Sequence, residues 1–590
     1  LVGVVAAPAA AQDGATGERI VIQPAGRATW AQMVATEMID QRDLIKLPEV
    51  VHSPTKLDKS ERPLDAERID AEVQPDDAPA AAVRSLRSLD DLALQNGFLG
   101  MADNNTSIPP DTMGAVGPNH LMTMLNTQVG IQNKQGGQFS IVSLDTFWTV
   151  GTGISGDPFD PVLLYDALSG RWIACADADS RSASSSVFFA ISDGADPTQG
   201  WTFYEIDADP TNVSWADFPG FGVNSTWIAI TNNMFTVAGN GFSGVKMWVI
   251  DKSTALAGGA LTITTFNQGF DLAGNLDGFT MRPAQTFDAA ESNLYIIDNS
   301  GFSSGGIPLL RLSRITGTGP APVWNALPGI FGGVNAGSGL YSVVNDFSLG
   351  FPDASQLGSG VRVQTNDYRI INAVVRNGRL WCTHAAGLPE SGADRTAAFW
   401  YEWNPTNGAL QQSGVISGGA DTHHFFPSLS VNSANDMVIG FSRSDAGRFV
   451  EAAYTGRLAG DVFGTTRPIT VMKVGEDVYE KSFGSGQVRW GDYSATGVDP
   501  VDDLTFWSLQ QYAETDVGAS QSNDRWGAWW SEIGSASLCP TDLTGDGQTD
   551  GADLGVLLGA WGTNQYDFNG DGTIDGADLG IMLGSWGPCP

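Results

Sequence analysis

Short apolar runs separated by turns recur along the chain from about residue 96 to residue 534. In each instance an apolar run meets a turn of Asp, Asn and Gly residues, and the next run opens on an aromatic or bulky apolar residue. Short apolar runs bounded by such turns predict β-strands joined in hairpins. The residues that open the second run are Leu121, Trp172, Trp227, Tyr295, Trp381, Val438 and Trp507.

These hairpins predict a mainly β fold over residues 96–534, a β-propeller of seven blades (roughly six to eight) with the recurring turn between the inner two strands of each blade. A pair of β-sandwiches is the alternative, although a closed ring protects strand edges better. The stretches "PPDTMGAVGPNHL", "DPVLLYDALSGRW", "FPSLSVNSANDMVIGFSRS" and "RWGDYSATGVDPVDDLTFW" resemble blade segments of secreted bacterial β-propeller modules. Most such modules have no established activity, so this resemblance implies a fold and no function.

The pattern differs before residue 96. Residues 1–11 form an apolar run that ends in Ala9, Ala10 and Ala11, which predicts the remnant of a secretory signal peptide, with a frayed apolar terminus as the alternative. We interpret residues 12–95 as a leader or linker, partly helical or disordered, with a Pro- and charge-rich stretch and a second short helix near residues 81–96. The apolar positions of its first helix are Trp30, Met33, Val34, Met38 and Ile45.

Charge restricts the partners of this chain. Its 590 residues include 66 Asp and Glu against 31 Lys and Arg, a formal charge of −35. Nucleic acids and anionic membrane surfaces are bound by basic patches, so neither is expected as a partner. No later run approaches the roughly 18 apolar residues of a membrane-spanning helix, so we expect a secreted or cell-surface protein without a transmembrane segment.

The last 52 residues, 539–590, contain one acidic pattern twice, 25 positions apart, after a short linker at 535–538. Each copy places oxygen-bearing side chains at loop positions 1, 3, 5, 9 and 12 and Gly at position 6, which is the spacing of an EF-hand calcium loop, although position 12 is Asp instead of Glu. We therefore expect two calcium ions. The expected ligands are Asp542, Thr544, Asp546, Gln548, Asp550 and Asp553 in one loop and Asp567, Asn569, Asp571, Thr573, Asp575 and Asp578 in the other.

Each loop precedes a short apolar helix, and we expect the two helices to bury their apolar faces against each other once metal neutralises the carboxylates. The expected packing residues are Leu554, Leu557, Leu558 and Trp561, and Leu579, Met582, Leu583 and Trp586. Cys539 and Cys589 flank the pair, and export makes a disulfide between them plausible.

These two loop–helix repeats resemble a type I dockerin of the Cys-flanked variety, a small all-α calcium-binding domain. The resemblance implies a cohesin-like partner, or another surface protein, bound with loop positions 10 and 11. Dockerins often have hydroxyl residues there, whereas this chain has Gly551 and Ala552, and Gly576 and Ala577. The near-identity of the copies suggests two binding orientations.

Acidic residues recur where blades are expected to begin, at Asp111, Asp160, Asp217 and Asp492. Propeller glycosidases gather carboxylates from several blades on one face, so Asp217, Asp492 and Asp160 are weak catalytic candidates. The alternative is that each Asp caps its own turn or braces neighbouring blades. The sialidase Asp-box pattern S-x-D-x-G-x-x-W is absent, and most of the 18 Trp are expected in the core, although exposed Trp or Tyr could stack on sugars.

Other motifs favour structural interpretations. The GxSxG match at 301–305 and the GxGxxG match at 239–244 lack a following helix and are expected to be turns. His423 and His424 could bind metal or transfer protons near the central face, with an exposed loop pair as the alternative. Cys175 and Cys382 are expected to be buried thiols, with a bridge between them possible.

The sequence therefore favours an exported binding or scaffold propeller, not an enzyme, attached to a cell-surface or multiprotein assembly through a calcium-dependent dockerin-like module. Its ligand could be a polysaccharide or a glycoprotein. The competing hypothesis is a carbohydrate-active propeller, a glycoside hydrolase or lyase, delivered by the same module. A purely structural surface-layer component is the third possibility.

Overall fold

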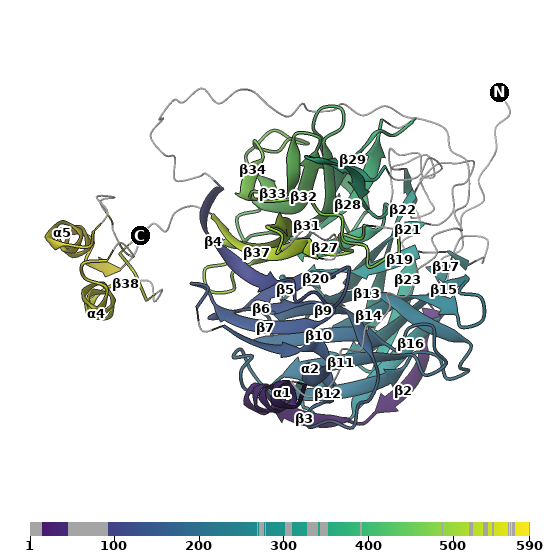
Figure 1. Ribbon diagram of the computed structural model, residues 1–590. Helices are drawn as coiled ribbons and strands as arrows, with labels where there is room; N and C mark the ends of the chain where they lie inside the picture. The colour runs from purple at the N-terminus through teal and green to yellow at the C-terminus, as the bar shows by residue number, and fades with distance from the viewer. Residues whose placement is uncertain are drawn as a thin grey trace. The chain divides into compact units, whose positions relative to one another are not determined.

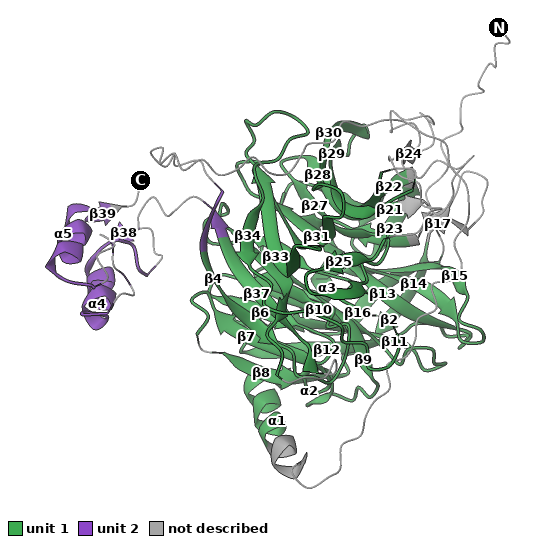
Figure 2. Cartoon of the chain, turned by 45° about the horizontal axis from the view of Figure 1, so that its top comes forward, with its two compact units in different colours: residues 1–79, 96–532 green, residues 80–95, 533–590 purple. Residues whose placement is uncertain are grey.

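The chain divides into two compact units, which are described separately. One unit comprises residues 1–79 and 96–532, and the other comprises residues 80–95 and 533–590 (Figure 2). The computed structural model describes residues 15–44, 92–137, 139–267, 269–270, 276–277, 279–300, 309–326, 340–342, 352–389, 392–486, 488–517, 523–534, 541–544, 548–563, 566, 568 and 573–588.

The first unit is mainly β and has a β-propeller arrangement built from antiparallel meanders of consecutive strands (Figure 1). We name each meander after its first strand. The β5 meander consists of β5 (Met113–Val116), β6 (His120–Met124), β7 (Gln128–Asn133) and β8 (Ser140–Ser143). The β9 meander consists of β9 (Pro158–Asp166), β10 (Arg171–Ala178), β11 (Ser186–Ser192) and β12 (Gly200–Asp207). The β13 meander consists of β13 (Ser214–Val223), β14 (Trp227–Thr236), β15 (Phe242–Asp251) and β16 (Leu261–Asn267).

The pattern continues through the rest of the unit. The β19 meander consists of β19 (Phe279–Pro283), β21 (Leu294–Ser300), β22 (Leu309–Thr318) and β23 (Ala321–Ala326). The β27 meander consists of β27 (Ile370–Arg376), β28 (Arg379–Leu388), β29 (Arg395–Asn404) and β30 (Ala409–Ile416). The β31 meander consists of β31 (His423–Val431), β32 (Met437–Asp445), β33 (Arg448–Arg457) and β34 (Thr470–Lys473). The β35 meander consists of β35 (Ala495–Val498), β36 (Phe506–Glu514) and β37 (Arg525–Gly534), followed in the sheet by β4 (Ala93–Ala102).

Short elements connect and cover these meanders. Strand β20 (Gln285–Thr286) makes parallel pairs with both β13 and β27. Strand β24 (Leu340–Ser342) pairs with β22, and β17 (Gly269–Phe270) with β18 (Leu276–Asp277) and β25 (Ala354–Gln356) with β26 (Ser359–Val363) form two hairpins. The helices of this unit are α1 (Trp30–Leu44), α2 (Leu144–Thr149) and α3 (Lys252–Leu256).

The first strands of the meanders contact one another in a ring around one axis. Contacts run from β5 to β9, β13, β19, β27, β31 and β35 and return from β35 to β5. Strand β4, which lies early in the sequence, pairs with the last meander, so the two ends of the propeller segment share one sheet. This closed ring rules out the pair of β-sandwiches, and it places the first strands innermost.

The recurring turn joins the first two strands of each meander, as the hairpin pattern predicts. The residue expected to open the second strand lies near the start of that strand in every case, with no more than 1% of its surface exposed. These strands are covered on both faces by neighbouring meanders. Their side chains are therefore apolar on both faces, and the bulky residue packs between meanders. The residues are Leu121, Trp172, Trp227, Tyr295, Trp381, Val438 and Trp507.

The N-terminal segment differs from the expected linker. Strands β1 (Ala15–Thr16), β2 (Glu18–Ile22) and β3 (Gly26–Thr29) pair with the outer strands β23, β16 and β12 of three successive meanders. We call β1–β3 the N-terminal strap. The strap covers three sheet edges that would otherwise present unpaired backbone groups.

Helix α1 follows the strap and confirms the predicted helix at Trp30. Trp30 and Met33 are buried, whereas Met38 is exposed, and Ile45 lies outside the described residues. Of the second expected helix, residues 81–91 lie outside the described residues, and residues 93–96 begin strand β4 instead. Among the described residues, no helix is both long enough and apolar enough to cross a membrane.

The innermost strands contain β-bulges at a common position. In β9, β13, β19 and β31 the register shifts near the start of the strand, and a residue with positive φ lies at each shift. Bulky residues rarely adopt this left-handed backbone, so the surrounding structure must hold it in place. Each bulge changes the direction of the side chains near the start of its strand. The residues are Asp160 (φ 48°), Phe218 (φ 58°), Thr280 (φ 56°) and Phe426 (φ 51°).

The second unit contains the two C-terminal repeats. Helices α4 (Gly551–Gly559) and α5 (Gly576–Gly584) contact each other, and β38 (Gln548–Thr549) pairs with β39 (Gly587–Pro588). Leu557, Met582 and Ile574 form the buried centre, with Leu554 and Leu579 partly buried against it. The expected packing is wrong for four side chains, because a helix of nine residues buries only one narrow face. The exposed residues are Leu558, Trp561, Leu583 and Trp586.

Candidate functional site

Four carboxylates from distant parts of the sequence meet at one end of the innermost strands. Asp160 lies in β9 and Asp217 in β13, whereas Asp111 and Asp492 immediately precede β5 and β35. Their side chains are between 2% and 8% exposed. The structure therefore brings together all four acidic residues that the sequence placed at blade entrances, and we call them the axial carboxylate cluster.

Asn126 ties two members of the cluster together. Its Nδ2 donates to Asp111 Oδ2 at 2.6 Å, and its Oδ1 accepts from the backbone N–H of Asp160 at 2.7 Å. The hydroxyl of Tyr493 donates to Asp160 Oδ2 at 3.1 Å. Neutral donors thus hold these two carboxyl groups.

Asp492 lies in a different environment within the same cluster. Asn366 Nδ2 donates to Asp492 Oδ1 at 2.7 Å, and the Arg489 guanidinium donates to Oδ2 at 2.9 Å. An amide and an adjacent guanidinium favour the ionised carboxylate. Asp492 is therefore the member of the cluster that pairs directly with a cation.

The pKa values of the remaining carboxylates are raised and differ from one another. Burial, with the negative charge of Asp492 next, raises the pKa of Asp160 to about 6. Burial, with the charge of Asp160 next, raises the pKa of Asp217 to about 8. Burial raises the pKa of Asp111 well above its usual range. Burial thus favours the protonated form of Asp217 more strongly than that of Asp160, and such a difference suits acid and base roles.

Sequence reasoning missed several groups that complete this site. Asp177, at the end of β10, is fully buried and accepts from Asn232 Nδ2 at 2.5 Å, and its pKa is raised by burial first and then by Asp160 and Asp217. Tyr493 stacks on Phe218 with 4.7 Å between ring centroids. No spacing motif marks these residues, because each reaches the axis through a bulge or a loop.

Two guanidinium groups lie over the ring of Phe218. The guanidinium carbon of Arg369 is 4.1 Å from the ring centroid, and that of Arg282 is 5.2 Å away. Arg369 also forms an ion pair with Asp367 at 2.7 Å. Arg282 donates to the backbone carbonyls of Pro219 and Ile370, and burial lowers its pKa to about 10. These cations partly offset the charge of the cluster.

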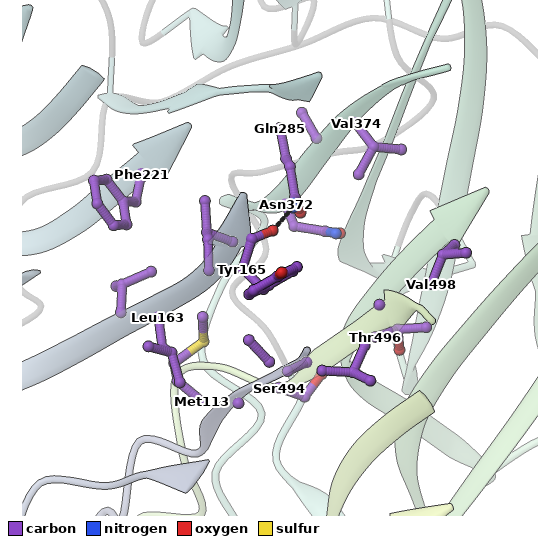
Figure 3. Close-up of a pocket in the computed structure, with 18 of the residues that line it drawn as sticks. Met113, Leu163, Tyr165, Phe221, Gln285, Asn372, Val374, Ser494, Thr496 and Val498 are labelled. Atoms are coloured by element: carbon purple, nitrogen blue, oxygen red, sulfur yellow. Dashed lines mark hydrogen bonds between the residues drawn. The ribbon is translucent and has the colours of Figure 1, made fainter. Parts of the chain in front are cut away.

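An axial cavity of about 80 Å³ lies further along the innermost strands. It is several times larger than the ~10–15 Å³ that a single water requires. Tyr165, Gln285, Asn372 and Thr496 contribute polar groups to its lining, and Gln285 Nε2 donates to the Tyr165 carbonyl at 2.9 Å (Figure 3). Tyr493 lines the cavity, but the four axial carboxylates do not. The cavity and the cluster are therefore neighbouring sites.

The two histidines are not an exposed loop pair, so that interpretation is wrong. His423 and His424 begin the innermost strand β31 and are fully buried. His423 Nδ1 accepts from the backbone N–H of Thr396, and burial lowers the pKa of His423 to about 4. His424 packs edge-to-face on Phe441. A neutral, buried imidazole of this kind is a core residue.

The remaining sequence motifs are structural where the structure describes them. The GxGxxG match at 239–244 connects β14 to β15 in an antiparallel hairpin, as expected, and the GxSxG match at 301–305 lies outside the described residues. Cys175 and Cys382 are buried free thiols, so they are not bridged. Cys539 and Cys589 lie outside the described residues.

The two C-terminal loops share one geometry. Asp553 Oδ1 accepts from the backbone N–H of Thr544 and Asp553 Oδ2 from that of Asp550, both at 2.8 Å. The corresponding Asp578 accepts from Phe568 and Asp575, again at 2.8 Å. Each position-12 carboxylate is thereby drawn back over its own loop. Asp550 and Asp575 cap their helices with φ of −141° and −142°.

The donor set of these loops fits calcium. Residues 539–590 contain eight Asp and no Lys, Arg or His, so the segment supplies no cation of its own. Hard oxygen ligands around a folded-back carboxylate are the chemistry that Ca²⁺ prefers. The expected ligands Asp546, Asp567, Asn569 and Asp571 lie outside the described residues. Within the described part of the chain, no group of three or more His, Cys, Asp or Glu side chains is placed to hold a metal.

Comparison with known proteins yields fold likenesses only. No family model matches the chain, and no curated protein matches it. A Trypanosoma rangeli sialidase in complex with the inhibitor DANA matches at 11% identity, with 65% of this chain and 57% of the sialidase covered and a TM-score of 0.33. A GH43 endo-arabinanase from Bacillus licheniformis matches at 14% identity, covering 50% of this chain and 95% of the arabinanase, with a TM-score of 0.26.

A hypothetical selenium-binding protein from Sulfolobus tokodaii matches at 10% identity, covering 63% of this chain and 78% of that protein, with a TM-score of 0.34. For the sialidase, the match spans 57% of its length, which is less than two thirds. At TM-scores this low the likenesses carry no argument about activity.

Proposed function

We propose that the propeller is a carbohydrate-active enzyme, a glycoside hydrolase, whose acid–base groups belong to the axial carboxylate cluster. The observation that supports this proposal is the meeting of four buried carboxylates from distant strands at one end of the ring, where burial raises the pKa of Asp217 to about 8 and that of Asp160 to about 6. Glycoside hydrolysis needs one protonated and one ionised carboxyl group at the scissile bond. The cluster supplies both at neutral pH.

The chemistry assigned to these groups is hydrolysis. Asp217 donates its proton to the leaving glycosidic oxygen, and Asp160 accepts a proton from the attacking water. The glycosidic C–O bond breaks, a new C–O bond forms to the water oxygen, and the two carboxyl groups exchange their protonation states, which solvent restores. Asp492, which is ion-paired with Arg489, stabilises the positive charge that develops on the sugar ring.

Release of soluble sugar from a panel of polysaccharides tests the proposal. The full chain is expected to release reducing sugar from at least one polymer, and Asp160→Asn and Asp217→Asn are expected to lower the rate by at least about 100-fold. Asp207→Asn is the matched control, because Asp207 is exposed at the end of β12. Equal activity of all three variants would contradict the assignment.

A second candidate is the non-catalytic binding module, and one observation favours it. The cluster is more than nine-tenths buried, and its carboxylates do not line the axial cavity. Buried carboxylates that are bonded by Asn126, Asn366 and Arg489 can brace neighbouring blades instead of reacting. Retention of the protein on a polysaccharide without any sugar release would identify this function.

We infer that the closed ring contains seven blades. In support, seven first strands succeed one another around the axis, and each begins a four-stranded meander, the last of which is completed by β4. The 10-stranded sheet contains two of these meanders joined by the two-residue strand β20. An experimental structure with any other number of blades would contradict this inference.

We also propose that the C-terminal repeats are a dockerin-like module that binds two calcium ions and attaches the exported protein to a cohesin-like or other surface protein. Gly551, Ala552, Gly576 and Ala577 are exposed at the starts of α4 and α5, which supports a role in partner contact. Trp561 and Trp586, which follow the ends of the two helices, are also exposed. Calcium-dependent binding to purified cohesins, lost in chelator and in Trp561→Ala with Trp586→Ala, is the test.

A further inference from the structure

One meander has a row of aromatic side chains at the end where the axial carboxylates lie. Trp215 in β13 pairs with Phe235 in β14, and Phe235 pairs with Phe242 in β15. Phe159 of the neighbouring β9 completes the row beside Trp215. Neighbouring ring centroids along the row are 6.4, 5.4 and 5.8 Å apart. We call these four residues the aromatic row.

The row extends outward from the axis. Phe159 directly precedes Asp160, and Trp215 lies two residues before Asp217, so the inner end of the row adjoins the carboxylate cluster. Cross-strand partners share one face of a sheet, so the row continues across β14 to β15, the third strand from the axis. Strands β13, β14 and β15 run side by side in Figure 1.

The outer part of the row is open to solvent. Phe242 is 42% exposed and Phe159 and Phe235 are partly exposed, whereas Trp215 is buried and its Nε1 donates to Asn240 Oδ1 at 3.1 Å. Trp215 is thus the buried member of the row, and the three Phe rings supply the exposed surface of the row. The nearby Val213 is 60% exposed and enlarges the apolar area.

Corresponding positions of other meanders are polar. In the β9 meander, Asp157 and Asp179 bond at the site that Trp215 and Phe235 occupy. In the β31 meander, His423 pairs with Ser444 at the same register. The β9 and β31 meanders thus have no aromatic pair at this register, so blade packing does not require partly exposed rings at this edge.

We propose that the aromatic row binds a neutral polysaccharide chain and leads it toward the axial carboxylates. The proposal deepens the proposed function, on which the direction toward the axis rests, by naming an extended neutral polymer as the substrate class. The C–H faces of pyranose rings are apolar and pack on flat aromatic rings, while sugar hydroxyls bond to polar neighbours. Hydroxyl, amide and carboxylate groups of this kind border the row at Ser214, Ser243, Asn240 and Asp209.

Charge selects the neutral polymer over an acidic one. The chain carries a formal charge of −35, and Asp157, Asp179 and Asp209 lie at the same end of the strands as the row. A polyanionic glycan would be repelled by this surface at low salt. An apolar surface with an acidic border therefore suits a neutral chain.

Retention of the full chain on insoluble neutral polysaccharides tests the proposal without requiring turnover. Phe235→Ala with Phe242→Ala is expected to weaken retention at least tenfold, because both rings lie at the surface of the row. Phe463→Ala is the matched control, since Phe463 is 70% exposed in the segment between β33 and β34. Single Phe242→Ala keeps the test valid if the double variant does not fold. Equal retention of Phe242→Ala, Phe463→Ala and the unaltered protein would overturn the proposal, as would retention by acidic polymers alone.

Turnover separates this proposal from the proposed hydrolase. Retention that depends on Phe235 and Phe242 but brings no sugar release supports the row and contradicts hydrolysis. If sugar is released, the aromatic variants are expected to raise KM for the polymer at least tenfold, whereas Phe463→Ala is expected to leave that KM unchanged. Sugar release with an unaltered KM for the polymer would overturn the row and leave hydrolysis standing.

Discussion

At the scale of single residues, burial gives the acidic residues at the axis properties that an exposed Asp lacks. The folded protein favours the protonated form of Asp217, whose pKa is raised from 3.8 to about 8 by burial first. The contribution of this residue to stability is complete below pH 3.8 and is lost as the pH rises through about 8. The axial cluster therefore makes the propeller more stable in mild acid than in mild base.

Asp217→Asn is expected to remove part of this pH dependence. Because Asn does not ionise, the variant is expected to exceed the unaltered protein in free energy of unfolding by about 1–3 kcal/mol at pH 8, taking about 1.4 kcal/mol per pKa unit as the upper scale. The difference is expected to disappear near pH 4. Urea unfolding at both pH values measures it, and Asp207→Asn is the control. An unchanged slope between pH 4 and 8 would show that Asp217 is ionised throughout.

Gly220 is a second residue on which the axial geometry depends. A Cβ atom at this position would lie 2.2 Å from Thr231 Oγ1 and 2.4 Å from the Met281 carbonyl oxygen. Gly220→Ala is therefore expected to lower the free energy of unfolding by about 2–4 kcal/mol, as overpacked sites do. Gly419→Ala is the control, because nothing lies within 4 Å of that Cβ. Thermal unfolding of both variants is the measurement.

At the scale of elements, the N-terminal strap stabilises sheets that lie far away in the sequence. Its three strands cover β12, β16 and β23, and the following helix places Glu37 where it accepts from Ser143 and Thr146. Each of these pairings joins residues more than a hundred positions apart. The strap therefore stabilises the folded ring through contacts that form only once distant strands have come together.

Removal of residues 1–29 is expected to lower the melting temperature of the propeller and to promote aggregation. The deletion exposes the backbone N–H and C=O groups of three sheet edges, which then pair with other chains. Light scattering during a thermal ramp measures both effects. Val21→Thr is the matched control, since Val21 lies in the strap but is 57% exposed. A truncated chain that melts and scatters like the full chain would show that the strap is dispensable.

At the scale of the whole molecule, the two units are expected to respond differently to calcium. Eight Asp without a basic residue repel one another in residues 539–590, so we expect ion binding and folding to be coupled in the smaller unit. Calorimetry of the full chain is expected to show two transitions, of which only the transition of the smaller unit moves up with calcium and down with chelator. Asp553→Ala with Asp578→Ala is expected to abolish that movement. A single transition that ignores calcium would contradict the metal assignment.

The sequence could predict the repeating part of this fold. A turn of Asp, Asn and Gly followed by a bulky residue is a local pattern, and Trp172, Trp381 and Trp507 lie where that pattern placed them. The two C-terminal helices were predictable for the same reason, because capping and apolar spacing act within one turn of helix. Turns and helix caps both depend on residues that are neighbours in the sequence, so the sequence alone predicts them.

The strap and the exposed Leu and Trp of the C-terminal helices were not predictable in this way. Val21 and Ile22 look like part of a spacer because their partners lie in β16, more than two hundred residues away. Trp561 and Trp586 look like core residues, but the short helices leave them at the surface. Pairing and exposure at these positions depend on contacts that the local pattern does not contain.

Three features follow from the amino-acid sequence alone: the hairpins of the meanders, the acidic composition and the acidic loop pattern that occurs twice. The hairpins and the loops are readable because each depends on residues that are close together in the chain. The meeting of Asp111, Asp160, Asp217 and Asp492 with Arg489 and Tyr493, and the raised pKa values of the first three carboxyl groups, depend on the fold. Ring closure brings together the starts of distant strands, and burial there favours the protonated form of a carboxyl group.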